Sequence, residues 1–557
     1  MLNKLISGAS IRKKIRNETG RLRLYYHTLR HLKRKQITGR IHRRVSGQVR
    51  SGKLPNPPEH LDGQLLSKIP FSESSSDSLI RKDITQGRFY FLNEWCDLGQ
   101  PVNWQPDRSL LWQFNLHYFN YLHLLEPSEQ HALCRDWVSR NPVGLQPGWH
   151  AYPTSLRIIN WCKADLQARD VLSSLYQQAA YLHRNVETHI LGNHVLENAR
   201  ALIFAGRFFN GQGEADTWID HGLRLYREQT PEQVLPDGGH FERSPMYHAI
   251  VLEGYVDVLN LLPDDHVDRF WLCKAVERMS DFMVSMRYPD GTLPLFNDST
   301  QEIALPADRL LTYVSAVTGY KPEPHRVFAE TGYYIDASDD IYLAIDGGPV
   351  GPDYLPAHAH ADIFSYVLAI HGHPFVTDTG VYEYEAGSKR DYVRSTQAHN
   401  TVCVDEIDQV ECWSSFRVAR RTSPRDVSFE KTDTIAHFEG TFDGYSDLLG
   451  ETVVHHRSIH LDRTKRSIRI TDTIRGSGTH TVESRVHLHP DVQAEHYPEG
   501  YRLVQGGVAA EIRTDQTAMD LEKGEYCPEF GKQIERSVLV MRKESRLPVQ
   551  FSYIITW

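Results

Sequence analysis

The chain has 557 residues, of which 40% are hydrophobic and 24% are charged, and its formal net charge is −9 at pH 7. This length is too great for one ordinary hydrophobic core, so we expect two or three domains, and no stretch holds the roughly 18 consecutive apolar residues of a transmembrane segment. The seven cysteines form no CxxC pair, which argues against both a disulfide framework and a thiolate zinc site.

Residues 1–53 form a basic extension with 16 Lys or Arg and a single acid, Glu18, whereas the rest of the chain is net acidic. Such an acidic body binds polyanions poorly in general, so we expect no nucleic-acid partner. We expect the extension to be a solvated helix, with peripheral contact to an anionic membrane surface as the alternative. No apolar segment of signal-peptide length precedes Arg12, so we predict no signal peptide and a cytoplasmic location, with the periplasm as the alternative.

The residue composition and the spacing of apolar residues change twice along the remaining chain. Residues 54–104 contain many Pro, Ser and Gly and are predicted to be a linker and lead-in. Between 105 and 333, bulky residues recur at spacings of three and four, which predicts helical hairpins in series, arranged as a ring or solenoid. Residues 334–557 hold many short β-rich runs between turns, which predicts an antiparallel β-sandwich. The expected fold class is α+β multidomain.

A first polar cluster is GNHVLEN, residues 192–198. Glycine and asparagine end one helix here, and the apolar residues that follow begin another. If Asn193 caps the new helix, His194 and Glu197 lie one turn apart on the same face. A helix cap with a surface His–Glu pair explains the pattern equally well.

A second cluster is DGGHFERSPMYH, residues 237–248. The two glycines and Pro245 predict an irregular entry into a helix, with Tyr247 in its first turn. The alternative is an ordinary buried aromatic residue at a helix start.

A third cluster combines His358 and His360 with Asp378 and His399. If residues 358–360 are extended, the two histidines point to the same side. A further imidazole and a carboxylate then complete a His/Asp/His set that suits zinc. Two histidines at this spacing also occur by chance in a chain that has 29 of them.

These side chains suit β-elimination on a 4-linked uronate. The reaction removes the proton next to the C6 carboxylate and expels the oxygen at C4, so the carboxylate must first be neutralised by hydrogen-bond donors. A Tyr or His then acts as base, and a Tyr hydroxyl returns a proton to the leaving oxygen. Asn193, His194, Tyr247 and His358 supply such a set. A glycoside hydrolase would need two opposed carboxylates, for which no paired motif is visible.

The segments 192–198, 239–248 and 358–402 together resemble the heparinase II/III polysaccharide lyases, and alginate lyases of the same architecture share the pattern. The resemblance runs from about residue 105 onward. It implies an incomplete (α/α) toroid followed by antiparallel β-sheets, with the active site in the cleft between them, and an acidic polysaccharide as substrate.

The resemblance also implies a role for each residue. Asn193 and His358 bind and neutralise the uronate carboxylate. Tyr247 is the proton-transferring acid and, for one C5 configuration, also the base. His194 is the base for the opposite configuration, and Glu197 orients a neighbour or assists neutralisation.

Further residues follow from the same resemblance. His360, Asp378 and His399 are similar to a structural zinc site of some members. The candidates for sugar contact by stacking and hydrogen bonding, with toroid core packing as the alternative, are Trp149, Tyr152, Arg157 and Asn160. Local positive charge for an acidic glycan is expected from Arg390 and Arg394.

The basic run 21–33 and the aromatic run 112–121 look like the branch of the family associated with bacterial surface-polysaccharide synthesis. That branch implies a substrate made by the cell itself, a capsule or O-chain polysaccharide. Two alternatives stay open: a non-catalytic glycan-binding or assembly protein on a lyase scaffold, and an (α/α)-toroid glycoside hydrolase. Retention of the whole catalytic set favours the lyase.

Overall fold

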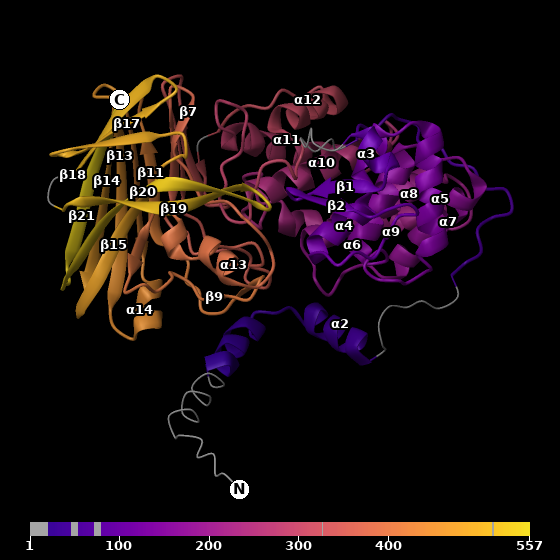
Figure 1. The fold of residues 1–557 in the computed structure, drawn as a ribbon, viewed down its shortest axis with the longest axis horizontal. Helices are drawn as coiled ribbons and strands as arrows, with labels where there is room; N and C mark the ends of the chain where they lie inside the picture. The colour runs from indigo at the N-terminus through magenta and orange to yellow at the C-terminus, as the bar shows by residue number, and fades with distance from the viewer. Residues whose placement is uncertain (1–19, 46–53, 72–79, 326, 515–516) are drawn as a thin grey trace, which may run out of the picture.

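The computed structural model describes residues 20–45, 54–71, 80–325, 327–514 and 517–557. A helical part and a β part lie side by side, and the basic N-terminal segment runs beneath their junction (Figure 1). None of the helices in these ranges combines the length and the apolar character that a membrane crossing requires. Residues 1–19 and 46–53 of the predicted basic extension, including the stretch considered for a signal peptide, lie outside the described residues.

The helical part packs its helices in successive pairs, with α6 on α8, α8 on α9 and α10 on α11. This arrangement agrees with the predicted toroid of helix pairs. Apolar residues on the facing helix surfaces form one large core, which explains why residues three and four apart are buried together. Its helices are α4 (Leu110–Tyr118), α5 (Pro127–Arg140), α6 (Ala151–Lys163), α7 (Arg169–Arg184), α8 (Asn193–Phe208), α9 (Ala215–Gln233), α10 (Pro245–Leu261), α11 (Arg269–Met286) and α12 (Ala307–Thr318).

The lead-in at 54–104 is more than a linker. It contains a short helix, α3 (Arg81–Thr85), and a hairpin of β1 (Arg88–Phe91) and β2 (Glu94–Asp97). The hairpin packs on α4, where the ring of Phe91 lies 5.1 Å from that of Trp112. It thereby becomes part of the toroid wall.

Three antiparallel sheets build the β part. The five-stranded sheet has the order β3 (Val327–Phe328), β4 (Tyr333–Ala337), β5 (Ile341–Asp346), β6 (Tyr366–Ile370) and β7 (His373–Val376). The eight-stranded sheet has the order β11 (Arg425–Lys431), β12 (Ile435–Phe442), β13 (Val453–Asp462), β14 (Ser467–Gly476), β21 (Val549–Thr556), β18 (Val508–Thr514), β17 (Gly500–Gln505) and β16 (Gln493–Tyr497). The four-stranded sheet has the order β19 (Met519–Glu529), β20 (Lys532–Arg546), β15 (Thr479–His487) and β8 (Val402–Val404).

Short elements connect these sheets, and the residues of the third cluster lie in the loops between the named strands and helices. A small hairpin pairs β9 (Cys412–Trp413) with β10 (Arg417–Val418). The short helices are α13 (Ser388–Val393) and α14 (Gly444–Leu449). As expected for a sandwich, burial alternates residue by residue along β12, so that one face packs inward and the other is more open.

The five-stranded sheet joins the two parts. Strands β5 and β6 are buried on both faces. One face packs on α11 through Phe282 and Met286, and the other packs on the core of the β part. The first strand of this sheet begins at Val327, so helices give way to strands a few residues before the predicted boundary at 333/334.

Candidate active site

A cavity of about 1230 Å³ lies where the inner ends of the toroid helices, the β part and the N-terminal segment meet. It is lined by all five residues predicted to be catalytic: Asn193, His194, Glu197, Tyr247 and His358. They come from α8, from α10 and from the loop after β5. The structure therefore brings the three sequence clusters to one place.

The start of α8 depends on Gly192, which has φ of +63°. A Cβ atom at this position would lie 2.4 Å from Oε1 of Glu242, so both the backbone and the space require glycine. Gly192 is the cap residue and Asn193 is the first residue of the helix, which therefore begins one position earlier than predicted. Asn193 donates from Nδ2 to Oε2 of Glu242 at 2.8 Å, while its buried Oδ1 has no partner.

His194 is held by Glu187, a residue that the sequence motifs did not mark. Its Nδ1 lies 3.1 Å from Oε2 of the fully buried Glu187. Burial alone would raise the pKa of Glu187, but the neighbouring His194 lowers that pKa to about 2. In return, Glu187 overcomes the effect of burial and raises the pKa of His194 above its usual value. The charged Glu187 carboxylate thus accepts a hydrogen bond from His194 and fixes the orientation of its imidazole ring.

Glu197 does not pair with His194, although it lies one turn along the same helix. Its carboxylate contacts the Arg200 guanidinium at 3.2 Å. Arg200 also contacts Glu253 at 3.0 Å and is hydrogen-bonded to Asp257. Burial raises the pKa of Glu197, with Arg200 opposing it. Glu187, and not Glu197, therefore holds His194, and Glu197 is part of a buried charge cluster at the cavity wall.

Tyr247 stands in the first turn of α10. Ser244 caps this helix by accepting from the Tyr247 amide at 3.2 Å, and Pro245 occupies the first helical position, as the motif predicts. The Tyr247 hydroxyl lies 3.0 Å from that of Tyr384 in the β part. Burial, together with Tyr384, raises the pKa of Tyr247 well above its usual value. The hydroxyl therefore keeps its proton at neutral pH.

His358 stacks on Tyr247, with ring centroids 3.8 Å apart and planes 27° apart. Its Nδ1 lies 2.9 Å from Oδ2 of Asp298, and its Nε2 lies 3.8 Å from Oε2 of Glu242. Glu242 thus stands between the two groups, Asn193 and His358, that were predicted to bind a uronate carboxylate. Nδ2 of Asn193 and Nε2 of His358 therefore both face the same oxygen atom, Oε2 of Glu242.

The residues predicted to contact sugar separate into two groups. Tyr152 and Asn160 line the cavity, and the Tyr152 ring lies 4.6 Å from that of His194. Trp149 and Arg157 are buried in the toroid core. Arg157 donates to the Gly148 carbonyl at 2.7 Å, and the Trp149 indole donates to a backbone carbonyl. The prediction of sugar contact is therefore wrong for Trp149 and Arg157, because core packing and surface stacking share one sequence pattern.

The two arginines after β7 are also buried and do not offer free charge to a ligand. Arg390 forms an ion pair with Asp298 and donates to it at 2.8 Å. Arg394 donates to the backbone carbonyls of Ala359 and Ser414, both at 3.0 Å. These contacts hold the loop that carries His358, so the predicted direct role in charge attraction is replaced by a positioning role.

The predicted zinc ligands lie beside one another and are fully buried. The rings of His360 and His399 are 5.3 Å apart, and Nδ1 of His399 lies 2.9 Å from Oδ1 of Asp378. Three buried polar atoms here lack a hydrogen-bond partner: Nδ1 of His360, Nε2 of His399 and Oδ2 of Asp362. However, in the parts of the chain that the structure describes, no three such side chains close around one point as metal ligands. The zinc site therefore stays a prediction.

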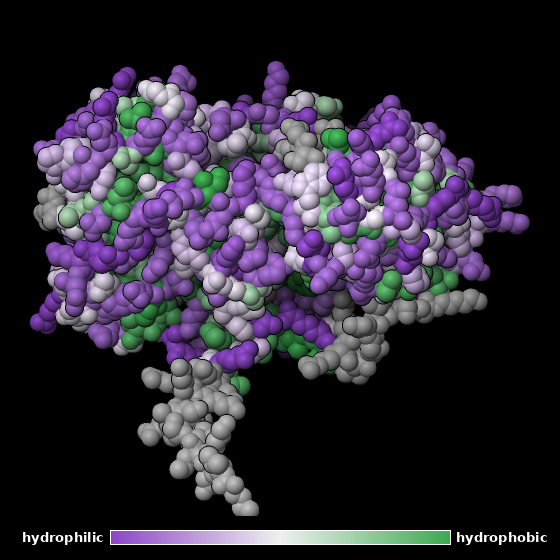
Figure 2. Space-filling view, in the orientation of Figure 1, coloured by the Kyte–Doolittle hydropathy of each residue, from purple (hydrophilic) through white to green (hydrophobic). Residues whose placement is uncertain are grey.

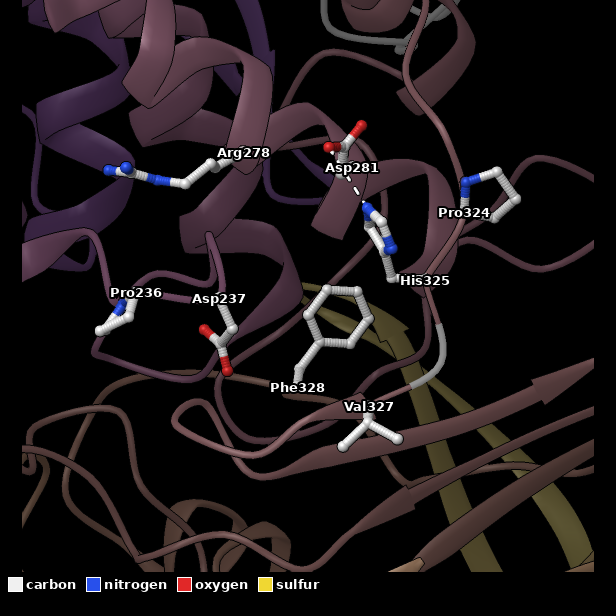
Figure 3. A pocket seen from close by; sticks show the side chains of 8 residues that line it. All are labelled: Pro236, Asp237, Arg278, Asp281, Pro324, His325, Val327 and Phe328. Atoms are coloured by element: carbon white, nitrogen blue, oxygen red, sulfur yellow. Dashed lines mark ion pairs between the residues drawn. The ribbon is translucent and has the colours of Figure 1, made fainter. Parts of the chain in front are cut away.

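A second hollow, of about 610 Å³, lies on another side of the molecule, between the end of α9, helix α11 and strand β3. His325 and Asp281 form an ion pair across it at 3.5 Å, whereas the Arg278 side chain points away from them (Figure 3). Asp237, at its base, already accepts hydrogen bonds from Thr331. Of the three sequence clusters, only Asp237 lines this hollow, and none of the residues predicted to be catalytic does.

Comparison with known proteins shows similarity to heparinase-type lyases. The chain is 24% identical to the heparin-sulfate lyase of Pedobacter heparinus over 522 residues, which covers 81% of this chain and 75% of that protein. It is also 25% identical to the FtsZ-localized protein C of Caulobacter vibrioides, over 62% of this chain and 61% of that protein. Among solved structures, a heparinase III shares the fold with a TM-score of 0.66 and 17% identity, covering 83% of this chain and 80% of that one.

Family models match most of the two domains. Residues 149–317 match the heparinase II/III N-terminus, and residues 321–553 match the heparinase II/III-like C-terminal domain. The matched ranges follow the observed change from helices to sheets and together include every residue placed at the cavity centre. This chain belongs to the heparinase II/III-like family of polysaccharide lyases.

Proposed function

We propose that this protein cleaves an acidic, uronate-containing glycan by β-elimination. The observation that carries the proposal is the stacked pair of Tyr247 and His358, which joins the two domains inside the cavity that Asn193 and His194 also line. In the reaction the C5–H and C4–O bonds of a 4-linked uronate break and a C4=C5 double bond forms. A base, an acid and donors for the carboxylate are needed together.

His194 is the proposed base for substrates in which the C5 proton and the C4 oxygen lie on opposite faces of the ring. Glu187 accepts from the Nδ1–H of His194, and this leaves Nε2 unprotonated and able to take the C5 proton. A buried carboxylate in this place also stabilises the imidazolium that forms. The pair follows the general arrangement of a base oriented by a carboxylate.

Tyr247 is the proposed acid, because its raised pKa keeps a proton available for the departing C4 oxygen. Tyr384, 3.0 Å away, can replace that proton from its own hydroxyl. When the C5 proton and the C4 oxygen lie on the same face, Tyr247 takes both roles in sequence: it first gives its own proton to solvent, then takes the C5 proton and passes that proton to the departing C4 oxygen.

Asn193 and His358 are proposed to neutralise the uronate carboxylate. As the C5 proton leaves, negative charge spreads onto that carboxylate, so donors fixed beforehand lower the barrier more than they strengthen binding of the ground state. Glu242 and Asp298 hold these donors in place. Because Glu242 is engaged by Asn193 and Glu197 by Arg200, neither carboxylate is placed as one of a hydrolase's two opposed catalytic acids.

For the biological substrate we propose a bacterial capsule or O-chain polysaccharide made by the same cell. The support is the resemblance of the basic run 21–33 and the aromatic run 112–121 to family members associated with surface-polysaccharide synthesis. We also propose a structural zinc held by His360, Asp378 and His399, supported by the unpartnered buried nitrogens of both imidazoles. When bound, it would brace the β wall of the cavity.

The test is ultraviolet absorbance during incubation with a panel of uronate glycans, including heparan sulfate, unsulfated heparosan, polymannuronate and polyguluronate. Elimination leaves a double bond conjugated to the carboxylate, so absorbance rises for at least one glycan. Tyr247→Phe is the matched control and should give no rise. New reducing ends without absorbance would identify a hydrolase, and binding without products would identify a glycan-binding protein.

A further inference from the structure

The N-terminal segment 20–45, called here the N-terminal strap, bridges the two domains beside the cavity. Gln36 is fully buried, and its amide donates both to the Ile190 carbonyl at 3.3 Å and to the Tyr354 carbonyl at 3.2 Å. Ile190 belongs to the helical part, just before α8, and Tyr354 belongs to the β part. One side chain of the strap thus ties both walls, and Figure 1 shows the strap running beneath their junction.

Further contacts fix the strap to each of the two domains. Toward the β part, the Trp413 indole donates to Thr28 at 3.1 Å and the Tyr25 ring lies edge-on 5.0 Å from it. Toward the helical part, Lys33 forms an ion pair with Glu232. The strap therefore packs against both domains beside the cavity, and it is not the solvated helix that the basic composition predicted.

Two arginines stand together where the strap meets the cavity. Arg40 of the strap and Arg417 of β10 both line it, together with Asn193 and Tyr247. Both residues are exposed to solvent within the cavity, and partial desolvation of the Arg40 guanidinium, together with the like charge of Arg417, lowers the pKa of Arg40. The Arg417 guanidinium lies 4.7 Å over the Trp413 ring.

Neither guanidinium has a carboxylate partner among the residues that the structure describes. Elsewhere in the same cavity, Arg200 is matched by acids. Two adjacent like charges repel one another unless a counter-charge is present, and none of the described residues is paired with either guanidinium as that counter-charge. The pair is thus arranged for an anion that comes from outside.

We propose that Arg40 and Arg417 form a second anion subsite, which binds a carboxylate or sulfate of the same glycan at a ring other than the one that is cleaved. The inference rests on the proposed function and adds to it the recognition of a repeatedly charged chain. Planar guanidinium groups suit both anions because they donate two parallel hydrogen bonds. The neighbouring Trp413 ring also offers an aromatic surface to a sugar.

The test compares Arg40→Ala/Arg417→Ala with Arg34→Ala/Lys35→Ala in the full chain. The control removes the same charge from exposed strap residues that do not line the cavity. Dissociation constants are measured for size-matched oligosaccharides of heparan sulfate and of unsulfated heparosan, after equal melting temperatures confirm that both variants fold. We expect binding to weaken about tenfold or more in the cavity variant, a loss of one good charged contact, and less than about twofold in the control.

The outcomes separate the subsite from the lyase proposal. Weaker binding of both glycans supports a carboxylate in the subsite, and weaker binding of only the sulfated one supports a sulfate. If the wild type cleaves glycan and the cavity variant binds like the control, the subsite is wrong and the lyase stands. If the wild type cleaves nothing but binds in an Arg40- and Arg417-dependent way, the subsite stands and the lyase is wrong. A wild type that binds neither glycan overturns the subsite, whereas the lyase proposal is decided by the absorbance test on the whole panel.

Discussion

Tyr247 comes from the helical part and His358 from the β part, yet their rings stack face to face in the cavity. Each side chain that would react is held by another: Glu187 on His194, Tyr384 on Tyr247 and Asp298 on His358. Groups fixed in this way need no reorganisation as charge develops. At the residue scale, catalysis is therefore expected to be sensitive both to the reacting atoms and to the residues that hold them.

Replacing Tyr247 by phenylalanine removes one hydroxyl and keeps the ring that stacks on His358. We expect kcat to fall by at least about 100-fold, the usual range for a lost proton-transfer group, while glycan binding changes little. Initial rates of the absorbance rise provide the measurement. Tyr384→Phe is the control and should lose less, because its hydroxyl acts only through Tyr247. More than a tenth of wild-type activity in the Tyr247 variant would contradict the assignment.

Glu187→Gln tests the base through pH. The pKa of His194 is raised by Glu187, with smaller contributions from Glu242 and Glu197, so activity should rise as pH passes through this raised value and the imidazole loses its proton. The glutamine lacks the negative charge, hence the pKa of His194 falls and the acidic limb of kcat/KM moves to lower pH. The profile is measured on the glycan that the wild type cuts best. If the acidic limb of kcat/KM does not move in Glu187→Gln, a group other than His194 produces that limb.

Among the elements, α8 and α10 begin at the cavity and present Asn193, His194 and Tyr247 in their first turns. Helix starts suit this task because their end groups are not yet committed to helical hydrogen bonds. Each start is set by a local device: Gly192 with positive φ for α8, and the Ser244 cap for α10. Disturbing such a device should move the site without touching a reacting atom.

Gly192→Ala combines an unfavourable φ with a Cβ atom that would lie 2.4 Å from Glu242. We expect a loss of roughly 1 to 2 kcal/mol of stability and a larger, separate loss of activity, because Asn193 and Glu242 must move. Gly319→Ala is the matched control, since Gly319 has φ of +71° but no neighbour within 4 Å. The Gly319 variant should lose a similar free energy of unfolding, measured by denaturant titration, and should keep its activity. Full activity in the Gly192 variant would show that this glycine only shapes the turn.

At the scale of the whole molecule, the five-stranded sheet, the loops after it and the N-terminal strap hold the two domains in one arrangement. The cavity exists only in this arrangement, because the residues that line it come from both domains. Figure 2 shows a recess at the lower edge between the two parts, bordered by both hydrophilic and hydrophobic residues. Membership in the family does not by itself set the activity, since one relative is named for localisation with FtsZ. The residues at the cavity centre are the stronger argument.

Metal removal tests the wall of that cavity. If zinc binds at His360, Asp378 and His399, a chelator should lower the melting temperature by a few degrees, since an ion that binds only the folded chain stabilises it. His360→Ala should behave like chelation, whereas His358→Ala should abolish turnover with little change in melting temperature. Elemental analysis of the active protein accompanies the melts. Active protein without metal would remove the zinc and leave the lyase proposal unchanged.

Local patterns in the sequence determined the order of the two domains and the helical and β character of each, and they singled out Asn193, His194, Tyr247 and His358 as candidates, which the structure brings together in one cavity. They could do so because periodicity, helix caps and short motifs involve residues near one another in the chain. Only the tertiary structure decided the partners of these residues, such as Glu187 for His194, and it moved Trp149 and Arg157 from the site to the core. It also turned a basic extension into a strap that places Arg40 in the cavity. Partners from distant segments have no spacing to detect, because the chain alone does not state which surfaces meet.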